Sequence, residues 1–330
     1  MTLESDIDTL LVRMDKIGDL VVSLNANEHP ALEGQRCLWL VNQGLSWVMN
    51  ASEPRKNYIE FEKKLRISRF FSLVSQIKKL HLQQAIVFQA PWFIGLALFL
   101  ARVPIRIGRK SQWHSFFFFN RGIRQKRSLS DRHESQYNWD LISEGLHWNS
   151  YPTITFPQMK APTQPPIENW SLKNKEYCVV HPGMMGSALN WPTDSYKSLI
   201  EALREKINVV ITGTAADRPW TSPLKSIPDP EKNILWLNEK LSGDELLILL
   251  KNARFVIAPS TGVIHLAAAL NTPVVGFYSP RIVEKETRWG PLTDKKIIFS
   301  PPTNRRNDPA CMHLITEENV FNELEKKQLL

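Results

Sequence analysis

The sequence predicts an α/β protein made of two open α/β domains. Short β-forming runs alternate with helical patterns through most of the 330 residues, which is typical of parallel βαβ units. A stretch rich in proline, residues 151–174, divides this alternation into two series. Each series contains a strand that turns through a glycine-bearing loop into a helix. A chain of this length usually forms two domains of roughly 150 residues.

The first series is expected to contain a helix over 68–80 and four strands, at 10–14, 37–41, 85–89 and 105–108. Its longest apolar run, 91–101, is about half of the roughly 20 residues that cross a bilayer. We therefore expect a buried helix there and no membrane span.

The second series is expected to have strands at 177–181, 208–212, 255–258 and 274–278. Its helices begin near Thr193, Ser242 and Gly262, with Thr193 and Asp194 able to cap the first helix and Ser242 with Glu245 forming a capping box for the second. Five prolines in 151–174 disfavour helix and sheet alike. We therefore place a first domain at 1–155, a linker at 156–174 and a second domain at 175–330.

Positive charge is concentrated in the first half of the chain, which has a formal net charge of +8 overall. Residues 1–160 hold 21 Lys plus Arg against 14 Asp plus Glu, and residues 102–132 alone hold nine basic residues and one acid, interleaved with Trp113 and the phenylalanines 116–119. This segment favours an anionic partner, either phosphorylated glycolipid, a membrane surface or nucleic acid. The alternative is a solvated loop whose aromatic side chains pack inward. Because no nucleic-acid-binding motif accompanies the charge, nucleic acid is the least favoured partner.

Cysteine usage and the N-terminus indicate a cytoplasmic protein. The three cysteines, Cys37, Cys178 and Cys311, are far apart and form no Cys-x-x-Cys pair, so neither a disulfide framework nor a cysteine zinc site is expected. The N-terminus is acidic and shows no pattern of a secretory signal. We expect a cytoplasmic monomer, and a basic segment that meets lipid or its phosphates would give it peripheral contact with the inner face of the cytoplasmic membrane.

The first stretch that could carry chemistry is 11–20, Leu-Val-Arg-Met-Asp-Lys-Ile-Gly-Asp-Leu. It predicts a strand that turns into a helix, where Gly18 permits a tight turn and a close approach of the backbone. Asp19 would stand in the first turn of that helix. A carboxylate is favoured there by the helix dipole and can serve only as a cap, so the residues leave both a structural and a catalytic role open.

Two further stretches also lie between a strand and a helix. Residues 181–192 contain two glycines and a serine, whose backbone N–H groups can point at a diphosphate, and the same pattern also suits a structural turn. Residues 258–270 open a helix with small and hydroxylated residues that could hold an anion. His265, inside that helix, is by itself more typical of a buried, hydrogen-bonded histidine than of a catalyst.

Several other chemistries lack a motif. The sequence contains no Gly-x-Gly-x-x-Gly or Walker lysine motif, so dinucleotide and P-loop chemistry are disfavoured. It has no His-x-x-x-His, His-Glu-x-x-His or Asp-x-Asp pattern and no Gly-x-Ser-x-Gly. We therefore expect no metal, no cofactor and no serine-hydrolase activity.

Taken in order, these stretches resemble glycosyltransferase family 9, the lipopolysaccharide heptosyltransferase family. The most specific parts are 12–19, 181–192 and 260–280. Weaker matches are 106–108, 133–138, 212–214 and 288–291. The resemblance extends over about residues 10–315, and the joint occurrence of these motifs is far more specific than any one of them.

The resemblance implies a GT-B fold, in which two Rossmann-like domains face a cleft, with the acceptor held mainly by the first and the nucleotide sugar by the second. It implies metal-independent, inverting transfer of a heptose-like sugar from a donor such as ADP-heptose to a lipopolysaccharide core or similar glycan. Asp19 occupies the position of the general base, and Gly18, Arg109, Lys110 and Arg121 are expected near the acceptor. The expected donor-binding residues are Gly183, Met184, Gly186, Ser187, Thr212, Gly213, Asp217, Leu241, Ser260, Thr261, Gly262 and His265.

Two positions depart from the family pattern. Leu189 and Asn190 replace a basic residue that often precedes the Trp-Pro of the second motif, and Ser260 replaces an aspartate that is common in the third. Both changes weaken the assignment to ADP-heptose enzymes. The alternative function is therefore a nucleotide-sugar-binding protein of the same fold that has lost catalysis.

Overall fold

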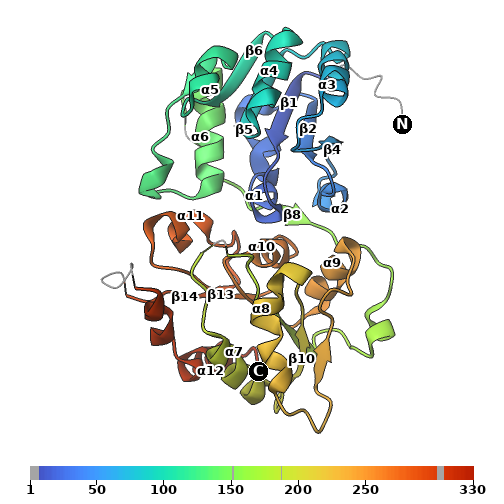
Figure 1. The fold of residues 1–330 in the computed structure, drawn as a ribbon, viewed down its shortest axis with the longest axis vertical. Coiled ribbons are helices and arrows are strands. Elements are labelled where there is room, and N and C mark those ends of the chain that lie inside the picture. The colour runs from blue at the N-terminus through green and yellow to red at the C-terminus, as the bar shows by residue number, and fades with distance from the viewer. Residues whose placement is uncertain (1–6, 151, 187, 303–307) are drawn as a thin grey trace. The chain divides into compact units, whose positions relative to one another are not determined.

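The computed structural model describes residues 7–150, 152–186, 188–302 and 308–330. The chain divides into two compact units, the first formed by 1–127 and 132–158 and the second by 128–131 and 159–330. Unit 1 is coloured from blue to green in Figure 1, and unit 2 from yellow-green to red. Each unit has one parallel six-stranded sheet.

Unit 1 arranges its sheet in the order β4-β2-β1-β5-β6-β7, and every neighbouring pair is parallel. This is the mononucleotide-binding order 3-2-1-4-5-6, in which the strand order reverses between the first and fourth strands, here β1 and β5. The elements are β1 (Thr9–Arg13), α1 (Ile17–Val21), β2 (Cys37–Asn42), α2 (Ser46–Asn50), β3 (Ser52–Glu53), β4 (Asn57–Phe61), α3 (Ile67–Lys79), β5 (Gln84–Gln89), α4 (Trp92–Leu100), β6 (Ile105–Arg109), α5 (Trp113–Phe118), β7 (Arg121–Ile123), α6 (Glu134–Leu146) and β8 (Gln158–Met159).

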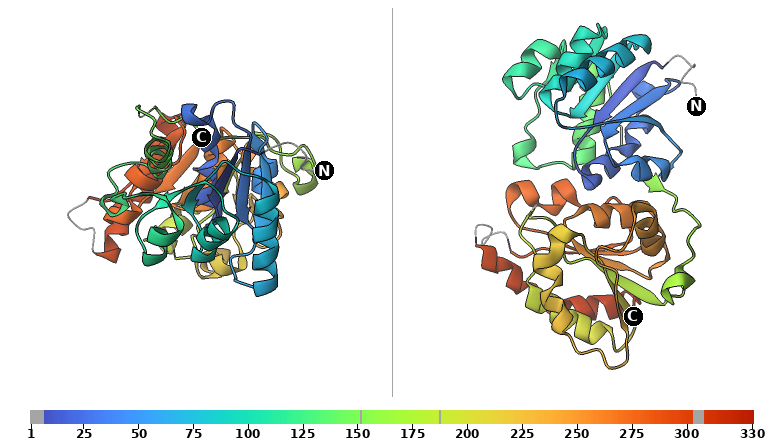
Figure 2. Two further views of the ribbon diagram at one scale, coloured as in Figure 1. Left: turned by 90° about the horizontal axis from the view of Figure 1, so that it is seen from above. Right: turned by 45° about the vertical axis from the view of Figure 1, so that its right-hand side comes forward.

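The core of unit 1 lies between its sheet and the helices α3 and α4. Phe70, Leu73 and Ile77 of α3 follow the i, i+3, i+7 spacing of one helix face, and they pack with Leu10 and Val12 of β1. Helix α5 packs beside α4, because the ring of Phe118 lies against Gly95. These three helices therefore form one layer over the sheet, which Figure 2 shows from two sides.

Unit 2 has the order β11-β10-β9-β12-β13-β14, again parallel throughout, with the reversal between β9 and β12. Helices α7 and α12 contribute apolar side chains to the core on one face of the sheet. The elements are β9 (Tyr177–Val180), α7 (Thr193–Leu203), β10 (Asn208–Ile211), α8 (Arg218–Thr221), β11 (Ile234–Trp236), α9 (Gly243–Asn252), β12 (Val256–Pro259), α10 (Gly262–Ala269), β13 (Val274–Phe277), α11 (Glu286–Trp289), β14 (Lys296–Phe299) and α12 (Glu317–Lys326).

The predicted α/β class with two parallel sheets is confirmed, and the eight expected strands agree with β1, β2, β5, β6, β9, β10, β12 and β13 to within a residue or so at each end. The capping box of Ser242 and Glu245 is also present at α9. The expected cap at α7 is wrong: the N-cap is Pro192, and no side chain bonds there. The expectation of neither helix nor sheet in 151–174 is also wrong, because β8 pairs with β3 and Ile167–Trp170 form a 3-10 helix.

The helix expected to be buried at 91–101 is only partly buried. Five residues of α4 are buried, but Trp92, Phe99 and Leu100 are each more than 40% exposed. No helix in the part of the chain that the structure describes has the length and apolar character needed to span a bilayer.

Candidate active site

Arg13 organises a cluster of charged side chains at the carboxyl end of β1. Its guanidinium is almost completely buried and lies 2.8 Å from Asp19 Oδ1, 3.2 Å from Asp15 Oδ2 and 3.2 Å from Glu134 Oε1. Burial alone would lower the pKa of Arg13, but the attraction of Glu134, Asp19 and Asp15 outweighs it and raises that pKa. A buried cation is tolerated only with such compensation, so Arg13 fixes both aspartates at this edge of the sheet.

The first turns of α6 hold Arg13 and the segment after α1 in place. Glu134 also pairs with the buried Arg127, and Asn138 accepts a bond from Arg13. The amide of Asn138 donates in turn to Ser23 Oγ, and Ser23 Oγ donates to the carbonyl oxygen of Asp19. The weakly matching stretch 133–138 therefore acts by positioning the residues around Asp19.

Asp19 and Asp15 differ in their surroundings. Asp19 is the third residue of α1, and its side chain is about one-fifth exposed. Asp15 lies in the loop between β1 and α1, where burial raises its pKa, the nearby Arg13 lowers it and Asp19 raises it further. The sequence motif pointed only to Asp19. Asp15 and Lys16 are charged residues that come just after the buried strand β1. This local pattern could also have pointed to Asp15.

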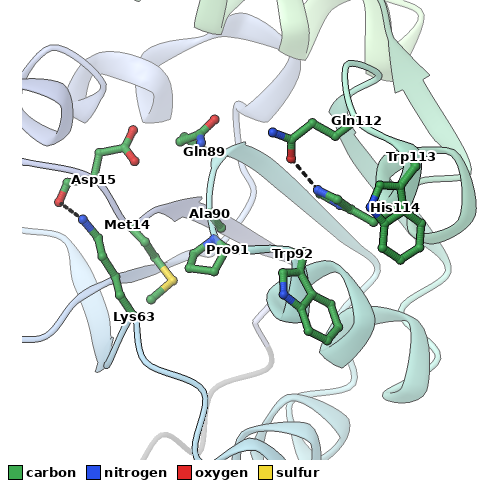
Figure 3. Close-up of a pocket in the computed structure, with 10 residues that line it drawn as sticks. All are labelled: Met14, Asp15, Lys63, Gln89, Ala90, Pro91, Trp92, Gln112, Trp113 and His114. Carbon is green, nitrogen blue, oxygen red and sulfur yellow. Dashed lines mark hydrogen bonds between the residues drawn. The ribbon is translucent and has the colours of Figure 1, made fainter.

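Figure 3 shows a pocket of about 690 Å³ at the carboxyl edge of the unit 1 sheet. Its walls come from loops that follow β1, β4, β5 and β6. Asp15 and Gln89 supply polar groups, Lys63 donates from Nζ to the carbonyl oxygen of Asp15 at 3.1 Å, and two tryptophans supply flat apolar surfaces. The lining residues are Met14, Asp15, Lys63, Gln89, Ala90, Pro91, Trp92, Gln112, Trp113 and His114.

The four residues expected near the acceptor do not share one site. Gly18 is buried in α1 beside Asp19, and Arg109 donates to Gln89 at the edge of the pocket. Lys110 lies with its Nζ 4.9 Å from the centroid of the Phe116 ring. Arg121 begins β7 and donates to the carbonyl oxygen of Gly145 at 2.9 Å, so the structure ties it to the end of α6 and not to the pocket.

In unit 2, the loop after β9 packs directly on the loop after β10. A Cβ atom at Gly183 would lie 2.1 Å from Asp217 Cγ, so only glycine permits this approach. Asp217 accepts bonds from the backbone and hydroxyl of Thr214, and His181 Nδ1 lies 3.0 Å from Thr212 Oγ1. Asp217 was expected near the ribose, but the structure buries its carboxylate within the loops that it holds together.

The same loop then turns outward. Met184 is buried, whereas Met185 is 61% exposed. Met185 and Gly186 both have positive φ angles, 54° and 71°. A methionine in this region is uncommon, and two such residues in succession turn the chain sharply toward α7. Ser187, expected to bind the donor, lies outside the described residues.

The third motif opens α10 directly across the strand-order reversal from the loop after β9. Ser260 and Thr261 follow β12, and Gly262 is the first residue of α10. His265 is buried in the second turn of that helix. Ligands of such sheets lie at the carboxyl ends of the strands on either side of the reversal, so the structure brings the second and third motifs to one edge of unit 2.

The remaining donor-binding predictions follow β10 and β11. Gly213 is close-packed, since a Cβ there would lie 3.0 Å from both Asn238 Nδ2 and Thr221 Cγ2. Thr212 is buried with His181, as described above, and Leu241 is half-buried in the segment before α9. Thr212 and Gly213 thus adjoin the loop after β9, and Leu241 lies one strand further out.

Leu189 and Asn190, which replace the family's basic residue, serve the loop itself. Asn190 Nδ2 donates to the carbonyl oxygen of Pro182 at 2.7 Å, and the backbone N–H of Leu189 donates to Glu284 Oε2 at 3.1 Å. Glu284 also pairs with Arg281, whose Nη1 lies 3.4 Å from Glu284 Oε1. Glu284 therefore links Arg281 to the backbone of Leu189. No motif in the sequence pointed to Arg281.

Comparisons with known proteins agree with this architecture. The chain matches glycosyltransferase family 9 (heptosyltransferase) over residues 71–315, a range that begins after Asp19. It is 27% identical, over 96% of its own length and 95% of the relative's, to a Haemophilus influenzae protein provisionally named a glycosyltransferase.

Two solved structures from Escherichia coli have the same fold. ADP-heptose lipopolysaccharide heptosyltransferase II superimposes with a TM-score of 0.81 at 18% identity, over 97% of this chain and 98% of that one. A heptosyltransferase solved with ADP gives a TM-score of 0.73 at 18% identity, over 97% and 99%. In the described residues, no group of three or more histidine, cysteine, aspartate or glutamate side chains could hold a metal ion. With its two parallel sheets and its match to the family over most of its length, this chain belongs to glycosyltransferase family 9 and is a glycosyltransferase of GT-B fold.

Proposed function

We propose that the protein transfers a heptose-like sugar, with inversion, from a nucleoside diphosphate donor to a lipopolysaccharide core or a similar glycan. The carboxylates that Arg13 holds at the edge of unit 1 carry this proposal, since a nucleotide-sugar-binding protein without catalysis needs no such cluster. The lipopolysaccharide heptosyltransferase that shares the fold supports the acceptor class, and the relative solved with ADP supports the donor class.

In the proposed reaction, Asp19 is the general base. Its carboxylate takes the proton of the acceptor hydroxyl while the hydroxyl oxygen attacks the anomeric carbon from the side opposite the leaving group. The bond between that carbon and the donor phosphate oxygen breaks, and the nucleoside diphosphate leaves with the electron pair. The ion pair with Arg13 orients the carboxylate.

Unit 2 is proposed to stabilise the departing diphosphate mainly through its backbone. The loop containing Gly183, Met184 and Gly186 and the start of α10 at Ser260–Gly262 offer N–H groups at the same edge of the sheet. Thr212, Gly213 and Leu241 extend this edge toward the nucleoside, and His265 lies behind the start of α10.

The pocket of unit 1 is proposed to bind the acceptor. Trp92 and Trp113 offer the flat apolar faces on which sugar rings stack, and Gln89 and Gln112 offer amides for hydroxyl groups. Lys63 and the neighbouring Arg109 favour an acceptor that carries phosphate or carboxylate groups. Asp15 lies in the wall of this pocket, so it is the rival to Asp19 as the base.

Transfer measurements on Asp19→Asn and Asp15→Asn distinguish the two carboxylates. We expect Asp19→Asn to reduce kcat by about 10²–10⁴-fold, the usual contribution of a general base, while donor affinity measured by calorimetry is unchanged. Asp15→Asn should mainly raise KM for the acceptor. Asp244→Asn, at an exposed position in unit 2, is the matched control.

Three results would contradict the proposal. A larger loss of kcat in Asp15→Asn than in Asp19→Asn would make Asp15 the base. Equal loss of donor binding and transfer in Asp19→Asn would assign that residue a structural role. Failure of the unaltered protein to transfer or hydrolyse any of a panel of nucleotide sugars, despite binding them, would favour the binding protein without catalysis.

A further inference from the structure

The helix layer of unit 1 exposes an unusual number of large apolar side chains. Ile67 and Phe71 of α3 are 74% and 60% exposed, and Phe117 of α5 is 71% exposed. Monomeric soluble proteins rarely leave such side chains grouped on one surface without a partner. The set that we call the apolar face is Ile67, Phe71, Phe99, Leu100, Trp113, Phe116 and Phe117; Trp92 of α4 is also exposed and lines the pocket.

These side chains lie on neighbouring helices. Trp113, Phe116 and Phe117 follow i, i+3, i+4 spacing, so they share one side of α5. The ring of Phe99, near the end of α4, lies 6.2 Å from that of Phe118 of α5. Helix α3 packs on the other side of α4, as the views of unit 1 in Figures 1 and 2 show.

The charge around the apolar face is mainly positive, and the acid Glu62 pairs with Arg66 and Arg69. Residues 63–130, which include all three helices, contain 14 lysines and arginines and no aspartate or glutamate. Some of these cations lie over the exposed rings: Arg106 Cζ is 5.4 Å from the Phe99 centroid, and Lys110 Nζ is 4.9 Å from that of Phe116. Others are exposed at the ends of α3, at Lys63, Lys64, Arg66, Arg69, Lys78 and Lys79.

Only part of the basic segment predicted from the sequence contributes to this surface. Arg127 is buried against Glu134, and Arg121 is bonded to the end of α6. The basic residues in and just before α3, which precede the predicted segment, supply positive charge to this surface instead of Arg121 and Arg127. The sequence therefore predicted the charge of the surface but misplaced its extent.

We propose that the apolar face and its basic rim bind an anionic lipid bilayer. Exposed aromatic and aliphatic side chains enter the boundary between headgroups and acyl chains, while lysines and arginines meet anionic headgroups. A protein partner would need a complementary strip of acidic residues. A nucleic acid would leave Ile67, Phe71 and Phe117 in water, so the bilayer satisfies more of this surface than either.

Trp113 joins this surface to the unit 1 pocket, because it lines the pocket and is also 70% exposed. A bilayer on the apolar face would therefore lie beside the proposed acceptor site. The binding itself does not depend on the reaction, so vesicles that contain neither donor nor acceptor test it separately from the proposed function.

Flotation with vesicles tests the proposal. The unaltered protein should float with vesicles of phosphatidylglycerol and phosphatidylethanolamine, and about tenfold less with phosphatidylcholine alone. The double variant Ile67→Ser with Phe117→Ser removes two exposed side chains outside the pocket and should lower binding about tenfold. Val283→Ser with Leu314→Ser removes two exposed apolar side chains from unit 2 and should leave it unchanged.

Charge and self-association are measured on the same samples. Lys78→Gln with Lys79→Gln should weaken binding less than the apolar variant does, and more strongly at low salt than at high salt. Equal binding of the unaltered protein and the apolar double variant would overturn the proposal. So would a dimer, seen by sedimentation, that the apolar variant abolishes while flotation is absent, because the face would then bind a second copy of the chain.

Discussion

The two units share a strand order but equip the same edge of the sheet in different ways. In unit 1, the carboxyl edge carries acidic side chains, with Asp15, Asp19 and Glu134 held by the buried Arg13. In unit 2, the corresponding edge is made of close-packed backbone, in which Gly183 lies directly on the buried Asp217. One edge is suited to moving a proton and the other to binding an anion through N–H groups. In our proposal, the same topology supports both tasks, through side chains in one case and main chain in the other.

Of the substitutions that test this difference between the units, removing the charge of Glu134 is expected to have the largest effect on stability. Glu134→Gln deprives the buried Arg13 and Arg127 of their shared anion. Loss of one partner from a buried ion pair destabilises by about 3–5 kcal/mol, and we expect that loss in the free energy of unfolding by urea. Hydrogen exchange should accelerate in β1 and α6, whereas the amides of unit 2 should exchange as before.

Glu144→Gln is the matched control, because Glu144 lies on the same helix with an exposed side chain. It should change stability by less than about 0.5 kcal/mol. If both substitutions had the same effect, the cluster around Arg13 would be no more than a solvated surface network, and the contrast between the units would lose its basis.

The second prediction concerns the backbone packing of unit 2. Gly183→Ala places a methyl group 2.1 Å from Asp217 Cγ. We expect a loss of about 2–3 kcal/mol from overpacking, together with a marked loss of donor affinity, while unit 1 keeps its hydrogen-exchange pattern.

Gly186→Ala separates packing from backbone strain. A Cβ at Gly186 meets no atom within 4 Å, but its φ is 71°, so only strain of about 1 kcal/mol is expected. The combination of Gly183→Ala with Asp217→Ala should recover part of the donor affinity lost in Gly183→Ala alone. Failure of that recovery would show that Asp217 itself, and not the space it fills, is needed for binding.

The smallest expected effect is a dependence of stability on pH that both units share. Burial lowers the pKa of His29 in unit 1 and of His181 in unit 2 to about 4. His29 Nδ1 accepts a bond from the Ala31 backbone, which a protonated ring could not do. In the unfolded chain, both histidines become protonated below about pH 6.5. The contribution of the neutral, buried histidines to the free energy of unfolding is therefore complete above that pH and is lost as the pH falls toward 4.

Between pH 6.5 and about pH 5, each histidine should account for on the order of 1–2 kcal/mol of this loss. When urea unfolding is measured between these pH values, the free energy of unfolding should depend less on pH in His29→Gln and in His181→Gln than in the unaltered protein. The exposed His313 is the control, and His313→Gln should follow the unaltered protein. A change confined to one variant would mean that only one unit carries a pH-sensitive histidine.

The interior of both folds could be predicted from the sequence because most central strands are largely apolar runs, whereas β6 alternates isoleucine with arginine or glycine. The edge strands β4, β7, β11 and β14 were not predicted. They are short and only partly buried, and β7 is merely Arg-Gly-Ile. Edge strands lack a second neighbour that would require an apolar pattern on both faces.

The candidate site was predictable only in part. Glycine-bearing turns between a strand and a helix are local signals, so the loops after β1, β9 and β12 could be identified. Glu134 contacts Arg13 from 121 positions away, and no local pattern predicts that contact. Arg281 was missed for the same reason, since its relation to Leu189 passes through Glu284.

The separate cores of the two units have an evolutionary consequence. Each sheet is covered by helices of its own unit, and the last helix, α12, packs on α7 within unit 2. Recombination near residue 158 would therefore leave each of these two cores within one half of the chain. A descendant could acquire a new sugar specificity by exchanging one half of its gene while its inherited glycan recognition stayed intact.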